Sequence, residues 1–499
     1  MDTQEAKRQV IIVGGGITGL TLALMLQNLG INYVLLEAYG TVTPNVGASI
    51  GLFPNGLRIL DQLGCYEDIL SKAQQVEEMV FRNSASGKRI TTRRTGDLFI
   101  QRHGYPSIFM ERYQLLNVLY DHLKEKKRIF VNKKVRRVES LEDSALVHIA
   151  DGLVFEGQIV VGADGVRSTI RQEMWRNADD NNDSAAVPAR DRGTVPCEHA
   201  CIFGTAKPTS GITAGEVIGA SGDGTLAGCM GGPGGEVFVF WFWTLPKSQR
   251  SCSINSIPRF DEEDKQRQFK RSADALVADN GLRFSKIVDS LEHSGVTALP
   301  HFVMRRWHYG RIIIIGDAAH KFNPLVGQGG NSCIESCAAL INALQEQNLP
   351  SSGSWKLTEV TKAFVAVEDQ RVDRLVDMVE KCQEAMRASA WDTWKGRLVN
   401  KYISPLMPMS RWFNFYSGLI SGGLSLKGFS SPTPVHDWPY SDEKSVEDKN
   451  STLSKASVVA ALPVAALTAF LLARVLQQQN LLGDSLLPRI MEKVSKYRR

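Results

Sequence analysis

The sequence predicts an α/β protein in which a parallel-sheet domain is interleaved with a mixed β-sheet and is followed by a helical region and an apolar tail. Three observations predict this class. The first 40 residues read as strand, glycine turn, helix and strand; residues 129–160 and 200–245 show strand patterns; residues 358–388 show a helical pattern. With 499 residues, of which 43% are hydrophobic and 22% charged, the chain has material for several globular domains.

Charge and cysteine content argue against two classes of function. The net charge of +5 is small for this length and the basic residues are spread out, so nothing favours nucleic-acid binding. The eight cysteines include no C-x-x-C pair, and Cys333 and Cys337 supply only two sulfurs. We therefore predict reduced thiols, without a zinc site or a disulfide framework.

The N-terminal segment has the pattern of a Rossmann-type β-α-β unit. Val10–Val13 predicts a strand, residues 14–19 a glycine turn, Leu20–Leu29 a helix, and Tyr33–Leu36 a second strand that ends at Glu37. This is the setting in which a glycine-rich turn binds a dinucleotide.

Gly14, Gly16 and Gly19 match the G-x-G-x-x-G fingerprint of such turns. The first glycine permits the tight turn, the second lets a pyrophosphate approach the backbone, and the third lets helix and strand pack closely. The helix N-terminus offers free N–H groups to the phosphates. Glu37 lies 18 residues beyond Gly19, where a carboxylate binds ribose hydroxyls. We predict that these four residues bind the cofactor.

Two later segments identify that cofactor. Residues 162–168 (GADGVRS) and 316–320 (GDAAH), the latter followed by Pro324 and by residues 327–331 (GQGGN), resemble the DG and GD motifs of FAD-dependent monooxygenases of the aromatic-hydroxylase (PHBH-like) family. With the glycine fingerprint, the motifs cover about residues 10–345 in the family's order. The resemblance implies FAD as cofactor, NADPH as co-substrate and O₂ as oxidant.

The GD motif also has a physical interpretation. Asp317 at a strand end can accept hydrogen bonds from the ribityl hydroxyls of FAD. Gly327 and Gly330 allow backbone N–H groups to approach the isoalloxazine, and the helix that begins there points its positive end at the ring. The alternative for Asp317 is a helix cap in a turn.

Three further FAD-binding residues follow from the resemblance. Arg112, which precedes a predicted helix, matches a family arginine that helps to bind FAD; an arginine taken alone is more often a surface cation or part of a salt bridge. Gly51 matches a position where the backbone passes the cofactor. Asp164 belongs to the motif that the family uses for FAD and NADPH, and it is expected to pair with Arg167 and hold the cofactor loop.

No catalytic residue is assigned from the sequence. Members of the family often carry a tyrosine in the strand around Ile202–Phe203, and this chain has none there. His308 and His320 are candidate proton handlers, but both are expected to be structural. No second G-x-G-x-x-G stands in a β-α-β setting, and Gly231–Gly235 predicts a hairpin turn, which fits transient docking of NADPH.

The predicted substrate is lipophilic. Phe238, Phe240 and Phe242 share one face of an apolar strand, so they either pack in the core or line an apolar tunnel. The overall pattern resembles FAD epoxidases of fungal meroterpenoid and indole-diterpene pathways, which oxidise a terminal alkene on a farnesyl or geranylgeranyl chain of an aromatic or indole head before a membrane terpene cyclase acts. Alternatives are a phenol or salicylate-type ring hydroxylase and an inactive flavin-binding membrane scaffold.

The expected domains are an FAD-binding part over 1–180 and 290–350 with some of the substrate sheet inserted, a substrate sheet over 181–289, a helical region over 351–430, a linker over 431–455 and a membrane-associating tail over 456–499. Ala456–Ala473 carries no charge and is expected to be a membrane anchor, an interfacial helix or a buried helix. The apolar stretches Tyr402–Met409 and Phe413–Leu426 are candidates to join a membrane surface. We expect an endoplasmic-reticulum location with the catalytic domain facing the cytosol.

Overall fold

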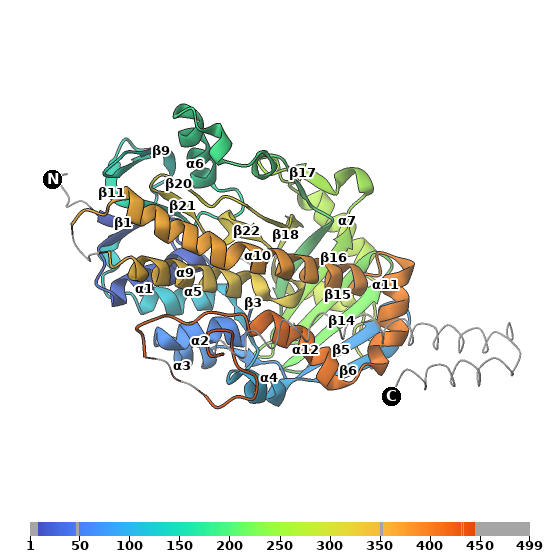
Figure 1. Ribbon diagram of the computed structural model, residues 1–499. Helices are drawn as coiled ribbons and strands as arrows, with labels where there is room; N and C mark the ends of the chain where they lie inside the picture. The colour runs from blue at the N-terminus through green and yellow to red at the C-terminus, as the bar shows by residue number, and fades with distance from the viewer. Residues whose placement is uncertain (1–7, 46–48, 350–352, 431, 433, 445–499) are drawn as a thin grey trace, which may run out of the picture. The chain divides into compact units, whose positions relative to one another are not determined.

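A computed structural model describes residues 8–45, 49–349, 353–430, 432 and 434–444. Two large β-sheets and a set of helices make up this part of the chain (Figure 1). The eight-stranded first sheet has the order β20-β21-β11-β1-β2-β8, with β10 paired to β11 and β9 paired to β10. Its strands are β1 (Arg8–Val13), β2 (Tyr33–Leu36), β8 (Ile129–Phe130), β9 (Val135–Ser140), β10 (Ala145–Ile149), β11 (Val154–Gly162), β20 (His308–Tyr309) and β21 (Ile312–Ile314).

The central strands of the first sheet are parallel, as the β-α-β pattern predicts. Val10 lies opposite Tyr33 of β2 and Ile159 of β11, and Val160 lies opposite Ile312 of β21. These strands are buried on both faces, which explains their continuous apolar runs. Because they are parallel, the loops after β1, β11 and β21 meet at one edge of the sheet.

The second sheet has seven strands in the order β18-β13-β16-β15-β14-β5-β6. Only β14 and β5 pair in parallel, so the sheet is mixed. Two of its strands come from the N-terminal part of the chain, which interleaves the two sheets as the sequence predicts. The strands are β5 (Glu78–Asn83), β6 (Arg89–Arg94), β13 (His199–Ala206), β14 (Glu216–Gly222), β15 (Thr225–Gly231), β16 (Val237–Thr244) and β18 (Leu291–Leu299).

Small sheets and short helices complete the body. A three-stranded sheet joins β3 (Ser49–Leu52), β7 (Ile108–Glu111) and β4 (Gln74–Gln75), and two strand pairs join β12 (Thr194–Pro196) to β17 (Ser251–Ser253) and β19 (Phe302–Val303) to β22 (His320–Lys321). The shorter helices are α2 (Pro54–Gln62), α3 (Tyr66–Leu70), α4 (Gly96–His103), α5 (Arg112–Asp121), α6 (Thr169–Asp180), α7 (Glu262–Ser272), α8 (Phe284–Val288), α11 (Trp394–Leu398) and α12 (Met409–Ile420).

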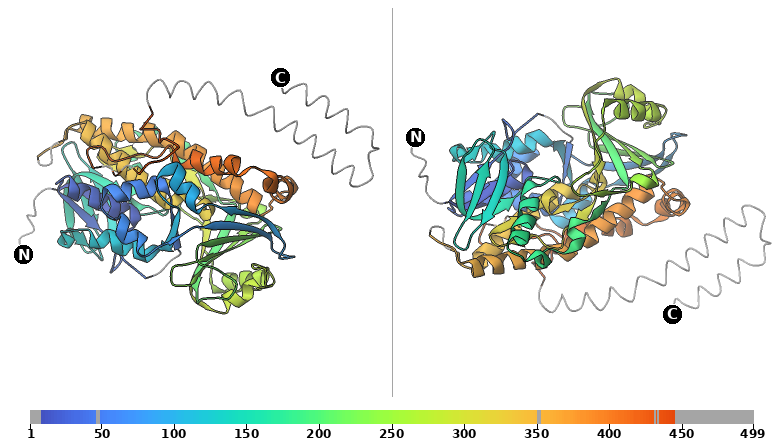
Figure 2. Two further views of the ribbon diagram at one scale, coloured as in Figure 1. Left: turned by 90° about the horizontal axis from the view of Figure 1, so that it is seen from below. Right: turned by 90° about the horizontal axis from the view of Figure 1, so that it is seen from above.

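Three helices position the region where the sheets meet. Helix α1 (Ile17–Asn28) packs against α9 (Gln328–Glu346), and α9 packs against α10 (Leu357–Ser389). Figure 1 shows α10 running from the first sheet to the edge of the second, and both views in Figure 2 place it along one side of the molecule. The helices predicted over 328–345 and 358–388 are therefore confirmed.

Two C-terminal stretches differ from the sequence-based expectation. Part of the predicted linker is fixed to the body: Tyr440 is 1% exposed, its hydroxyl donates to the His103 carbonyl at 2.9 Å, and Asp442 pairs with Arg58 at 2.9 Å. The apolar stretch from Phe413 is also mostly internal, since Phe413 and Leu419 are buried. Its hydrophobicity serves packing and is not available to a membrane.

No described helix is both long and apolar enough to cross a bilayer. The segment Ala456–Ala473, for which a membrane role is expected, lies outside the described residues. All eight cysteines are described and are free thiols.

A buried ion network holds α2, α9 and α10 together. Glu335 of α9 is fully buried and pairs with Arg371 and Arg374 of α10, the latter at 3.0 Å, while Asn55 of α2 donates to it at 2.7 Å. Burial alone raises the pKa of Glu335, but the two guanidinium groups outweigh it and hold the pKa at about 2. The carboxylate is therefore charged, and each arginine depends on it.

We predict that Glu335→Ala destabilises the protein by about 3–5 kcal/mol, because it leaves buried arginines without a counter-charge. Thermal unfolding measures the loss. Glu346→Ala, which removes a half-exposed carboxylate of the same helix, is the control and should leave the melting temperature nearly unchanged.

The same network predicts a pH dependence of stability. Since the pKa of Glu335 in the folded protein lies below the usual value of 4.5, the stability advantage of wild type over Glu335→Gln should be full above about pH 4.5 and shrink as the pH falls toward 2. Equal melting temperatures for Glu335→Ala and wild type would contradict the network's role.

Candidate active site

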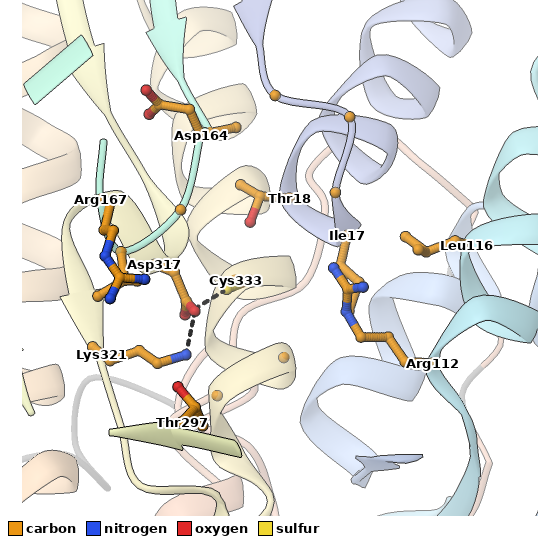
Figure 3. A pocket seen from close by; sticks show the side chains of 18 of the residues that line it. Ile17, Thr18, Arg112, Leu116, Asp164, Arg167, Thr297, Asp317, Lys321 and Cys333 are labelled. Atoms are coloured by element: carbon orange, nitrogen blue, oxygen red, sulfur yellow. Dashed lines mark hydrogen bonds and ion pairs between the residues drawn. The ribbon is translucent and has the colours of Figure 1, made fainter. Parts of the chain in front are cut away.

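A cavity of about 770 Å³ begins at the carboxyl ends of β1, β11 and β21 and extends to the second sheet. Its walls include the loops after these three strands, the start of α9, and residues of β13, β16 and β18. Figure 3 shows the polar side chains of this cavity arriving from several separate elements. The predicted residues Gly14, Gly16, Glu37, Gly51, Arg112, Asp164, Asp317, Gly327 and Gly330 all line it.

The three glycines of the turn have different surroundings: Gly14 and Gly19 are closely packed against backbone, whereas Gly16 has open space beside it. A Cβ on Gly19, which does not line the cavity, would lie 1.9 Å from the Gly14 carbonyl oxygen, and one on Gly14 would lie 2.4 Å from the Ala163 oxygen. A Cβ on Gly16 would meet nothing closer than Arg112 Nη2, at 3.8 Å. Gly16 therefore leaves space on the cavity side, next to the first turn of α1, which has no side-chain cap. These free N–H groups suit a phosphate.

Arg112 supplies a positive charge at the same place. It begins α5, and Figure 3 shows its guanidinium reaching toward Ile17 at the start of α1. Among the described residues it has no hydrogen bond or ion pair. Burial lowers the pKa of Arg112, and the nearby Asp317 and Glu37 offset only part of this effect. A negatively charged ligand bound beside the guanidinium would therefore stabilise its charged form. This environment favours an anionic ligand beside the glycine turn.

Glu37 lies at the end of β2, as predicted. Its Oε2 accepts a hydrogen bond from the Gly15 N–H at 2.6 Å, and its Oε1 accepts one from the Tyr39 N–H at 2.9 Å. Both contacts fix the carboxylate at the cavity wall, and each oxygen keeps a lone pair that can accept from a sugar hydroxyl.

Asp317 follows β21 and forms an ion pair that the sequence analysis missed. Its partner is Lys321, whose Nζ lies on the same wall, and the Cys333 thiol donates to Asp317 Oδ1 at 3.8 Å (Figure 3). Burial alone lowers the pKa of Lys321, but attraction to Asp317 outweighs it and raises the pKa, so the ammonium stays charged. The sequence did offer a signal for this ion pair, because Lys321 follows Asp317 by four residues.

The start of α9 is shaped by glycines and by Asn331. Gly327 has φ +67°, and a Cβ there would lie 2.5 Å from Phe53. Gly329 has no neighbouring atom within 4 Å of its Cβ position and faces the cavity. Asn331 donates to the carbonyls of Gly51 and Gly327, at 3.1 and 2.7 Å, which fixes the strand of Gly51 to this helix end. Backbone can therefore approach a flat ring here.

Asp164 does not pair with Arg167, contrary to expectation. Its carboxylate accepts hydrogen bonds from Ser168 Oγ, the N-cap of α6, and from the first-turn N–H groups of Thr169 and Ile170, the latter two at 2.7 and 3.0 Å. Arg167 donates to the Ile257 carbonyl at 3.3 Å. Unpaired N–H groups at a helix start outcompete a flexible guanidinium for this acid.

The two histidines have structural environments. His320 is fully buried, bonds Ser336 Oγ at 3.0 Å, and burial lowers its pKa to about 3, so it stays neutral. His308 Nδ1 lies 2.8 Å from Glu368. Neither lines the cavity.

Both interpretations of the phenylalanine face apply in part. Phe240 lines the cavity and stacks on Phe242 at a centroid distance of 5.9 Å, whereas Phe238 and Phe242 are buried in the packing. Gly231–Gly235 connects β15 to β16 as the predicted hairpin.

The geometry defines the class of site. An uncapped helix start with an arginine beside it suits a pyrophosphate, Glu37 and Asp317 offer acceptors for sugar and ribityl hydroxyls, and the glycines of α9 offer space for a flat ring. These residues fit a flavin adenine dinucleotide.

Comparison with known proteins identifies the family. The chain belongs to the FAD binding domain family, whose model matches residues 7–359. It is 34% identical over 409 residues to the FAD-dependent monooxygenase nvfK of Aspergillus novofumigatus, covering 81% of this chain and 84% of nvfK. It is 34% identical over 462 residues to the FAD-dependent monooxygenase dpchE of Colletotrichum higginsianum, covering 90% and 95%.

The fold is also found in solved structures. Klebsiella pneumoniae HpxO, complexed with FAD and uric acid, superposes with a TM-score of 0.68 at 21% identity, covering 83% of this chain and 96% of that one. The chain is thus an FAD-dependent monooxygenase with the fold of aromatic-hydroxylase-type flavoproteins.

We predict that Asp317→Ala weakens FAD binding by at least about tenfold, since a charged acceptor is lost and Lys321 loses its partner. The ratio of flavin to protein absorbance after purification and FAD titration measure the effect. Asp373→Ala, at an exposed position of α10, is the matched control. Normal FAD retention by Asp317→Ala would show that this carboxylate does not hold the cofactor.

The two kinds of glycine should respond differently to alanine. Gly16→Ala has room within the protein and should keep the melting temperature of the FAD-free form, while weakening FAD binding by occupying the phosphate side of the turn. Gly19→Ala should lower that melting temperature, because its methyl group meets the Gly14 carbonyl. Calorimetry with and without FAD separates the two effects. An equal loss of apoprotein stability in both variants would contradict the division.

Proposed function

We propose that this monooxygenase uses NADPH and O₂ to epoxidise the terminal alkene of a farnesyl or geranylgeranyl chain carried by an aromatic or indole head. In the balanced reaction, alkene, O₂, NADPH and a proton give epoxide, water and NADP⁺. The resemblance to prenyl-chain epoxidases motivates the substrate class. The observation that carries the proposal is the chemistry of the cavity wall facing the second sheet.

The second sheet contributes apolar side chains, a cysteine and one threonine, Thr297, to this wall but, within the described part of the chain, no carboxylate, histidine, lysine or arginine. Cys201 and Phe203 of β13, Phe240 of β16, and Leu299 of β18 line it, and burial raises the pKa of the Cys201 thiol well above its usual range. Among the described residues, the carboxylates and cations that line the cavity all lie outside the strands of the second sheet. Phenol hydroxylation benefits from a base near the ring, whereas alkene epoxidation needs only a nucleophilic double bond close to the oxidant. The wall therefore favours epoxidation.

The protein's own contribution is binding, orientation and exclusion of water. FAD, once bound and reduced, supplies the oxygen-activating chemistry. Phe203 and Phe240 offer aromatic surface against which an isoprenoid chain can pack. Because no charged residue of the second sheet lines the cavity among the described residues, an apolar substrate can bind there without water. The positive end of α9 favours negative charge on the reduced cofactor.

The direct test is NADPH consumption by FAD-loaded protein with farnesylated and geranylgeranylated aromatics, compared with simple phenols. We expect consumption that depends on the prenyl chain, and an epoxide identified in the product by mass and NMR. Phe240→Ala should raise KM for the prenylated substrate by about tenfold through lost apolar contact, whereas Phe130→Ala, away from the cavity, should not.

Two outcomes would contradict the proposal. A new phenol in the product, formed from simple phenols as readily as from prenylated ones, would make the protein a ring hydroxylase. FAD reduction without any oxygenated product across the series would favour a flavin-binding scaffold.

A further inference from the structure

A row of apolar side chains projects outward from the helical segment 394–406. This segment consists of α11, a π-helical turn (Val399–Ile403) and a 3-10 turn (Ser404–Leu406). Among the described residues, five of the twelve exposed large hydrophobic side chains belong to it. Their exposed fractions are 69% for Trp394, 44% for Leu398, 43% for Val399, 53% for Tyr402 and 68% for Leu406.

The spacing of these residues places them together. Trp394 and Leu398 lie four residues apart in α11 and therefore face the same side of that helix. Tyr402 and Leu406 continue the interval of four in the π-helical and 3-10 turns that follow directly. Figure 1 shows α11 at the outer end of α10, beside the edge of the second sheet. We call these four residues and Val399 the apolar row.

The segment is firmly attached to the body, so the exposure is not a result of fraying. Trp391, three residues before Trp394, is buried and its indole N–H donates to Asn400 Oδ1 at 3.1 Å. Arg93 of β6 donates to the carbonyls of Ser404 and Met407, at 2.5 and 3.0 Å. The fold thus fixes this backbone while directing large apolar groups away from the core, which marks an interaction surface.

The unpaired charges on the segment and on the stretch that follows it are positive. Residues 393–436 contain no aspartate or glutamate but five basic residues. Lys395, Lys401 and Arg411 are exposed and have no ion pair among the described residues, whereas Arg397 pairs with Asp223 at 2.8 Å and Lys427 pairs with Glu346. The Lys395 and Lys401 ammonium groups lie 5.7 and 5.2 Å from the rings of Trp394 and Tyr402.

We propose that the apolar row is a surface that inserts into the interfacial region of a membrane containing anionic lipids. Exposed leucines and aromatic rings flanked by lysines and arginines are the combination that such an interface binds, with apolar groups at the acyl boundary and cations on the headgroups. This proposal does not depend on the substrate assigned above.

A second copy of the chain is the main competing occupant. A symmetric dimer through this face would bring the three unpaired cations of each copy toward those of the other, which is unfavourable without intervening acids. Charge complementarity therefore favours an anionic lipid surface.

Full-length, FAD-loaded protein should show quenching of tryptophan fluorescence by brominated lipids in vesicles of phosphatidylcholine and phosphatidylserine, and less in phosphatidylcholine alone. Trp394→Phe should lose most of this quenching, whereas Trp438→Phe, the matched control, should keep it. The readout is local to Trp394 and holds whatever other parts of the chain contribute to vesicle binding. FAD content reports that each variant is folded.

Replacing Lys395, Lys401 and Arg411 by glutamine should reduce quenching at a given anionic lipid content by about tenfold in vesicle concentration. The same change at three exposed control residues, Lys270 and Arg271 of α7 and Lys286 of α8, should have little effect on the quenching. Quenching that persists in Trp394→Phe would overturn the proposal. So would concentration-dependent self-association that Leu398→Ser and Leu406→Ser abolish while vesicles quench nothing.

Discussion

Three chain segments meet at the carboxyl edge of the first sheet with no room for a side chain between them. Gly14 lies against the carbonyl of Ala163, Gly19 lies against the carbonyl of Gly14, and a Cβ on Gly316 would lie 2.4 Å from Thr18 Oγ1. These contacts join the loops after β1, β11 and β21, and β-branched or larger residues there would push them apart. The glycine turn and Asp317 take their positions from this junction.

The rest of the site extends from the junction toward the second sheet. Asp317 follows Gly316 directly and is paired with Lys321, and α9 begins a few residues later with Gly329 open to the cavity. The buried ion network at Glu335 fixes α9 against α10, while Asn331 fixes its start to Gly51. One end of the cavity thus carries charge and free N–H groups for a dinucleotide, and the other carries aromatic and aliphatic side chains. Such a division suits an oxidant delivered to an apolar substrate.

The sequence predicted the elements whose signals are local. The glycine turn, the strand that ends at Glu37 and the helix at 328–346 depend on short patterns, and they were found where expected. Contacts between distant segments were not predictable in the same way. Asp164 accepts hydrogen bonds from the first N–H groups of α6 and does not pair with Arg167. Tyr440 is buried and bonded to the His103 carbonyl, although the residues around it have the composition of a linker. Both depend on which partners the fold brings near, which no local pattern states.

The central claim is that FAD binds between the glycine turn and the start of α9, with its ring facing the apolar wall. A crystal structure of the FAD-loaded protein tests it most directly. The account predicts the pyrophosphate at Gly16 and Arg112, a ribityl hydroxyl bonded to Asp317, and the isoalloxazine between Gly329 and the side of the cavity that Phe240 lines. A flavin ring held away from Gly329 and Phe240 would contradict it, because the apolar wall would then have no oxidant to serve.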